Sequence, residues 1–168
     1  MTPHARPDDW DAPVSIPEVP GPRRILVPFD GSHTAERALA WSVLAARESG
    51  AEIVVVVAFD PPLTMRGRGA AFIEDVKAEL RDEAQSLAQE SVEILRQRGV
   101  RARGIVVRGD VAQGILQMAD DEAADLIIMG RQGLSHEVGG LERLRRIMVG
   151  GVAEKVSRHA AVPVMVVN

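Results

Sequence analysis

Short apolar runs alternate with amphipathic stretches along most of the chain. Five runs have the length and the apolar content of strands, and they lie at 24–29, 52–58, 102–108, 125–129 and 163–167. The run at 52–58 reads EIVVVVA, a continuous apolar segment of the kind that a strand buried on both faces of a sheet requires. Between these runs, apolar residues recur every three or four positions, which predicts four helices.

The predicted helices have recognisable faces and ends. The first, 34–48, has one small or apolar face: Ala35, Ala38, Leu39, Ser42, Val43 and Ala46. Ser32 provides N-cap chemistry before it, and Gly50 is placed to end it in the left-handed conformation. The long second helix ends before Gly99 and has the stripe Ile73, Val76, Leu80, Ala84, Leu87, Ser91, Ile94 and Leu95. Asp110 is expected to cap the third, with Gln113 as its capping-box partner, and the fourth covers 151–160.

The strict alternation of strand and helix predicts the fold class. It indicates an α/β protein with a single, doubly wound, five-stranded parallel sheet in a Rossmann-like arrangement, with right-handed crossovers. Ligands of such sheets bind outside the carboxyl ends of the strands, where the strand order reverses. The segments after the first and fourth strands have suitable chemistry, so we expect the site there.

The first 22 residues differ in composition from the rest. They hold six of the ten prolines, and proline lacks the backbone N–H that a helix interior or a central strand needs. We therefore expect a Pro-rich N-terminal tail at 1–22 and one folded domain at 23–168.

Composition and charge exclude several classes of function. The chain has 168 residues, no cysteine and a net charge of −4, which excludes disulfides and thiolate metal sites and argues against a nucleic-acid partner. No apolar run approaches the roughly 20 residues that span a bilayer, so no membrane partner is expected. The N-terminus lacks a signal pattern, which predicts a cytoplasmic protein. The histidines have no metal-ligand spacing, so we expect no protein-only metal site.

Two glycine-containing segments form a candidate anion site. The chain reads Gly130-Arg131-Gln132-Gly133 after the fourth strand and Gly150-Gly151-Val152 before the last helix. Glycines let the backbone approach an anion closely, and a helix N-terminus adds N–H groups and the positive end of its dipole. The alternative is that these glycines only end a strand and begin a helix.

From Arg23 to Asn168 the chain resembles the universal stress protein family, in its adenine-nucleotide-binding branch. The resemblance rests on ILVPFDGS at 25–32, LIIMG at 126–130, VAEKV at 152–156 and PVMVV at 163–167. It implies an adenine nucleotide alpha-hydrolase-like fold with strand order 3-2-1-4-5. It also implies a stress-response protein that forms a homodimer through the terminal strand 163–167, an apolar edge strand suited to pairing with a second copy.

The resemblance further implies ATP, AMP or ADP as the ligand and a role for each matching position. Pro28, Phe29 and Asp30 would face the adenine and ribose, and Ala58 would line the base pocket. The ribose and phosphates would lie against Met129, Gly130, Arg131, Gln132 and Gly133. The phosphate tail would be held by Gly150, Gly151, Val152 and Ala153. For Asp30, a simple turn or N-cap role is the alternative. A Mg²⁺ ion could arrive with ATP, held by phosphate oxygens and water.

The sequence departs from the family's glycine motif at two points. That motif is Gly, two residues, Gly, nine residues, then Gly followed by Ser or Thr. Here sixteen residues, 134–149, separate Gly133 from Gly150, which fits an insertion of about seven residues at 134–140. Gly151 replaces the hydroxyl residue, at an expected cost of about 0.5–1.5 kcal/mol, or about tenfold in affinity at most.

We therefore expect a nucleotide-binding protein rather than an enzyme. There is no GxxxxGK[ST] loop and no GxSxG elbow, and any ATP turnover would be slow. Two alternatives stay open: a dimeric scaffold that has lost nucleotide binding, and a slow ATPase.

Overall fold

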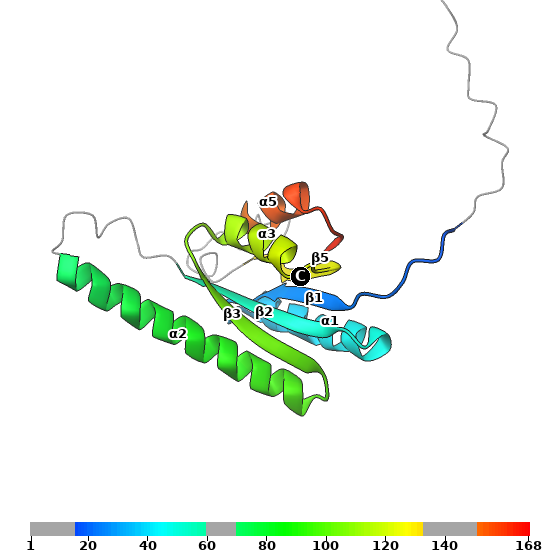
Figure 1. Ribbon diagram of the computed structural model, residues 1–168, viewed down its shortest axis with the longest axis horizontal. Helices are drawn as coiled ribbons and strands as arrows, with labels where there is room; N and C mark the ends of the chain where they lie inside the picture. The colour runs from blue at the N-terminus through cyan, green and yellow to red at the C-terminus, as the bar shows by residue number, and fades with distance from the viewer. Residues whose placement is uncertain (1–15, 60–69, 133–150) are drawn as a thin grey trace, which may run out of the picture.

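A five-stranded parallel sheet forms the centre of the protein. The computed structural model describes residues 16–59, 70–132 and 151–168. The strands are β1 (Arg24–Pro28), β2 (Glu52–Phe59), β3 (Arg101–Arg108), β4 (Leu126–Gly130) and β5 (Val164–Val167). Every neighbouring pair is parallel and the order is β3-β2-β1-β4-β5, so the predicted fold class and strand order are confirmed (Figure 1).

Helices cover both faces of this sheet. They are α1 (His33–Ser49), α2 (Ala70–Gln97), α3 (Val111–Asp121) and α5 (Gly151–His159). In Figure 1, α1 and α2 lie on one face of the sheet, and α3 and α5 lie on the other. The predicted bounds differ from these by one or two residues, because helix and strand ends are set by local capping that periodicity does not resolve.

The predicted caps form. The Ser32 side chain accepts a hydrogen bond from Ala35 N at 3.3 Å, and Gly50 ends α1 in the left-handed region at φ 74°. At the start of α3, Asp110 accepts from Gln113 N at 2.8 Å. The contacts of Ser32 and Asp110 fix where α1 and α3 begin, at the edge formed by the carboxyl ends of the strands.

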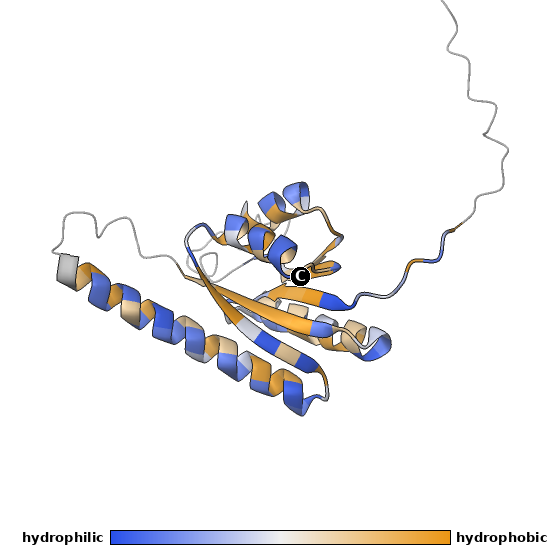
Figure 2. Ribbon diagram, viewed as in Figure 1, coloured by the Kyte–Doolittle hydropathy of each residue, from blue (hydrophilic) through white to orange (hydrophobic). Residues whose placement is uncertain are grey.

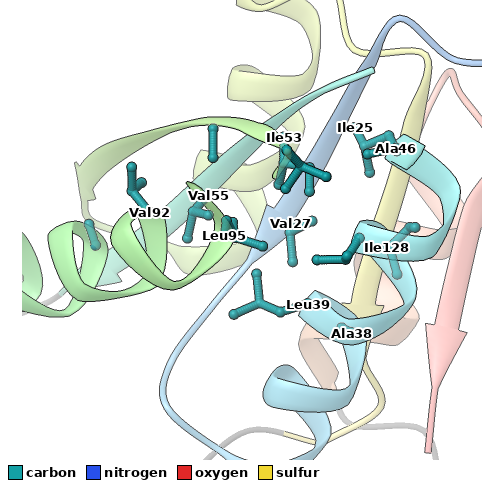
Figure 3. Packing of buried hydrophobic residues seen from close by; sticks show 14 of the residues in the cluster. Ile25, Val27, Ala38, Leu39, Ala46, Ile53, Val55, Val92, Leu95 and Ile128 are labelled. Atoms are coloured by element: carbon teal, nitrogen blue, oxygen red, sulfur yellow. The ribbon is translucent and has the colours of Figure 1, made fainter. Parts of the chain in front are cut away.

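The apolar core has two layers, one on each face of the sheet. Figure 2 shows β1 and β2 as mainly hydrophobic ribbons between amphipathic helices. In Figure 3, Leu39 of α1 and Leu95 of α2 pack around Val27 of β1. On the opposite face, Leu26 belongs to the cluster that includes Ile115 of α3. A strand with no exposed face explains the continuous apolar runs of the sequence.

The prediction that Ile94 belongs to the core is wrong. All six residues of the predicted α1 face are buried, but Ile94 of α2 is 52% exposed. The predicted Ala84, Ser91 and Leu95 are buried, and the C-terminal half of α2 also packs through Ala88 and Val92, which were not predicted. A Cβ at Gly104 of β3 would lie 3.1 Å from the Ala88 Cβ, so the glycine lets α2 approach through its alanine face. This contact turns Ile94 toward the flank that faces α1.

Asp125 fastens the start of β4 to the start of β1. Its Oδ2 atom accepts from the backbone N–H groups of Arg23 at 2.7 Å and Arg24 at 2.9 Å. The Asp125 N–H in turn donates to the Arg24 carbonyl at 2.9 Å. The bonds from the backbone of Arg24 and Arg23 lower the pKa of the Asp125 carboxyl below its ordinary value.

We expect the substitution Asp125→Ala to lower the free energy of unfolding by about 1 kcal/mol at pH 7, because two backbone donors lose a charged acceptor. The folded-state pKa is lowered, so this contribution is present above the unfolded pKa of about 3.9 and is lost as the pH falls through the folded-state value. Urea unfolding at pH 7 and pH 3 measures the difference from wild type, which should shrink at pH 3. Asp82→Ala, at an exposed position of α2, is the control. An Asp125 effect that is equal at both pH values would contradict this account.

Candidate functional site

A cleft opens where the chain leaves β1 and β4. The two strands are paired in the sheet, yet β1 continues into α1 on one face while the segment after β4 leads to α5 on the other. This is the switch point at which ligands of open parallel sheets bind. The cleft has a volume of about 180 Å³.

Most of the predicted site residues lie together in this cleft. The described residues that were predicted and that line it are Pro28, Phe29, Asp30, Ala58, Met129, Gly130, Arg131, Gln132, Gly151, Val152 and Ala153. They come from the ends of three strands and the start of α5, so segments distant in sequence converge as the topology requires. Gly133 and Gly150 lie outside the described residues, as does the predicted insertion at 134–140.

Five further residues line the cleft, and sequence reasoning did not assign them to the site. They are Ser32, Ala35, Val56, Val111 and Ile115. Val56 and Ile115 are almost completely buried and form its apolar floor, whereas Val111 is 36% exposed at its side. The topology could have indicated Val111 and Ile115, because α3 lies on the same face of the sheet as α5 and begins at the edge formed by the carboxyl ends of the strands. Periodicity placed Ile115 in the core but did not show that it borders a cavity.

Two helices, α3 and α5, begin beside the cleft, and the described contacts at their N-termini differ. The Asp110 carboxylate caps α3, and it also pairs with Lys155 of α5 at 3.2 Å. The hydrogen bond from Gln113 N, followed by that from Lys155, lowers the pKa of Asp110. By contrast, α5 begins at Gly151, where an added Cβ would meet no described atom within 4 Å. Among the described residues, none therefore blocks an anion from the backbone N–H groups at the start of α5.

Asp30 lies in a tight turn at the rim of the cleft. Its Oδ1 atom accepts from Ser32 N at 3.1 Å, and Gly31 between them has φ 78°, a conformation that favours glycine. The turn role that was the alternative for Asp30 is thus present, and the residue also lines the cleft. A carboxylate at this position could accept hydrogen bonds from the hydroxyl groups of a sugar.

Gly130 is required by its contact with α1. A Cβ at this position would lie 2.6 Å from Thr34 Oγ1 and 2.8 Å from the Thr34 carbonyl carbon. The glycine was predicted to let the backbone approach an anion, but the structure shows that it lets β4 approach the first turn of α1. Any side chain here would push apart the two elements that border the cleft.

The described residues contain no group of three or more His, Cys, Asp and Glu side chains arranged to hold a metal ion. Within the same residues, no helix is long and apolar enough to cross a lipid bilayer.

Comparisons with known proteins show what the chain is similar to. A universal stress protein of Thermus aquaticus is 34% identical over 147 residues, which cover 87% of this chain and 98% of that protein. The solved structure of MJ0577, a universal stress protein of Methanocaldococcus jannaschii, has a TM-score of 0.74 and 29% identity, and covers 89% of this chain and 96% of that one. A universal stress protein from Archaeoglobus fulgidus in complex with dAMP has a TM-score of 0.59 over 86% of this chain and 97% of that one; at 24% identity this likeness shows the fold.

The model of the universal stress protein family matches residues 21–168, which includes every described strand and helix. The chain therefore belongs to the universal stress protein family.

Proposed function

We propose that this protein binds an adenine nucleotide, ATP or its mono- or diphosphate relatives, in the cleft between β1 and β4, and acts as a dimeric regulator in the stress response. The observation that carries the proposal is the convergence of apolar side chains, the Asp30 turn and the first turn of α5 in one cleft. The apolar side chains suit a planar base, the Asp30 carboxylate suits the hydroxyl groups of a sugar, and the backbone N–H groups of α5 suit a phosphate chain.

The apolar part of the cleft suits the base. Val56, Ala58, Ile115 and Met129 supply aliphatic surface on the inner side, and three of them are at most 4% exposed. A volume of about 180 Å³ is below the roughly 300–1,000 Å³ of pockets that enclose a whole ligand. It therefore fits a base inside, with the rest of the nucleotide extending along the rim.

The phosphates are assigned to the start of α5. Gly151, Val152 and Ala153 line the cleft and form the first turn of this helix, where backbone N–H groups lack intrahelical acceptors. Arg131 also lines the cleft and adds a guanidinium group suited to phosphate oxygens. A Mg²⁺ ion would come with the triphosphate and be held mainly by its oxygens and water.

The dimer is assigned to the terminal strand, 163–167. β5 is the last strand in the sheet order and pairs with β4 on one side. Met165 at its centre is 40% exposed. An apolar edge strand can pair with its own copy about a two-fold axis and so cover its free backbone groups.

A scaffold without nucleotide is the second candidate. It is favoured by Gly151, which lacks the hydroxyl of the family motif, and by the longer segment 134–149. Dimerisation and docking would then be the whole function. A slow ATPase is the remaining alternative. It would bind the same nucleotide but would also release ADP and phosphate.

Filling the base pocket tests the proposal. Ala58→Leu adds three carbons inside the cleft, and we expect it to weaken ATP binding by at least about tenfold, because a clash of kilocalorie size has that effect on affinity. Ala78→Leu makes the same change at an exposed position of α2 and should leave affinity unchanged. Isothermal titration of nucleotide-free protein measures both. Wild-type affinity in Ala58→Leu would show that the base does not occupy this cleft.

Restoring the family's hydroxyl group tests the phosphate assignment. Gly151→Ser adds a donor at a position where an added Cβ would meet no described atom within 4 Å, and we expect ATP affinity to rise by up to about tenfold, the value of one hydrogen bond. Gly151→Ala is the matched control, since it adds the Cβ and the helix propensity without the hydroxyl. Equal affinities of the serine and alanine variants would contradict a phosphate at this turn.

A further inference from the structure

The carbonyl group of Gln132 is held by two hydroxyl groups from the start of α1. It accepts hydrogen bonds from Thr34 Oγ1 and, at 3.4 Å, from Ser32 Oγ. The two hydroxyl oxygens are themselves 3.5 Å apart. Residues about 100 positions apart in sequence therefore meet at the point where the chain leaves β4 for the glycine loop.

These contacts join the two sides of the cleft. Ser32 is 2% exposed, accepts from Ala35 N and donates its backbone N–H to Asp30. A continuous set of hydrogen bonds thus links Asp30, at the proposed ribose position, to Gln132, at the start of the proposed phosphate loop. A partly buried backbone carbonyl is usually hydrogen-bonded, and here the partners come from another element of the site.

The loop start is also fixed on its other side. Arg131 N donates to the Val167 carbonyl at 2.8 Å, which extends the pairing of β4 with β5. Gly130 lets this segment lie against Thr34 without a side chain between them. The positions of Arg131 and Gln132 are therefore held by β5 and α1 respectively.

We propose that Thr34 is a positioning residue whose hydroxyl group clamps the Gln132 carbonyl and so fixes Arg131 and Gln132, which line the cleft, before a ligand arrives. The importance of the clamp for ligand binding rests on the proposed function, but the clamp itself does not. Residues that are already ordered lose less conformational freedom on binding, and binding is tighter for that reason.

Thr34 allows a clean test because its hydroxyl is not a helix cap. Ser32 caps α1, so its replacement would disturb the helix itself. Thr34→Val removes the hydroxyl and keeps the shape and the β-branch, whereas Thr34→Ser keeps the hydroxyl. The serine variant therefore separates the hydrogen bond from the packing of the methyl group.

The experiment is a ¹⁵N relaxation measurement on the full chain of wild type, Thr34→Val and Thr34→Ser, with ATP titrated into each sample. Without ATP, we expect the order parameter of the Gln132 amide to be near the rigid value of about 0.85 in wild type and Thr34→Ser, and below about 0.6 in Thr34→Val. With ATP, Thr34→Val should bind several-fold more weakly than wild type, and Thr34→Ser should retain wild-type affinity.

Equal order parameters in the three proteins would overturn the clamp. So would a Gln132 amide that is flexible in wild type, or a serine variant that behaves like the valine variant. If wild type shows no response to ATP, the nucleotide proposal fails, and the order parameters still decide whether the clamp exists.

Discussion

The pairing of β1 with β4 is the constraint on which the site depends. Ile25 lies beside Leu126 and Leu26 lies beside Ile127, and the apolar clusters on the two faces of the sheet include or contact these four residues. The right-handed crossovers from β1 to β2 and from β4 to β5 run in opposite directions across the sheet, so the chain after β1 and the chain after β4 leave to different faces. The cleft is a consequence of this divergence, and the Asp125 contacts at the opposite end of both strands hold their alignment.

Close approach between α1 and β4 makes the cleft narrow and well defined. Gly130 permits the contact, and the hydroxyl groups of Ser32 and Thr34 turn it into a specific one through Gln132. On the other side of the cleft, the ion pair of Asp110 with Lys155 joins the starts of α3 and α5. Neighbouring elements of the cleft are therefore joined by side-chain contacts on each face of the sheet.

The sequence allowed the fold to be predicted almost completely, because the strands are buried on both faces and the helices have clear periodicity. The cleft residues at strand ends, such as Asp30, Ala58 and Met129, followed from the resemblance and the topology together. Three kinds of feature could not be predicted. Ile94 was misplaced because a helix face is set by what it packs on, here Gly104. The requirement for Gly130 and the clamp on Gln132 depend on distances between elements far apart in sequence, which no local pattern encodes.

Whether the cleft holds an adenine nucleotide can be decided from the small molecules that the protein carries through purification. The protein is denatured, and the released small molecules are separated by chromatography; stripped protein is then titrated with ATP. We expect released adenine nucleotide, or micromolar binding of added ATP. If there is no released nucleotide and no heat of binding, nucleotide binding in this cleft is contradicted, and the scaffold alternative remains.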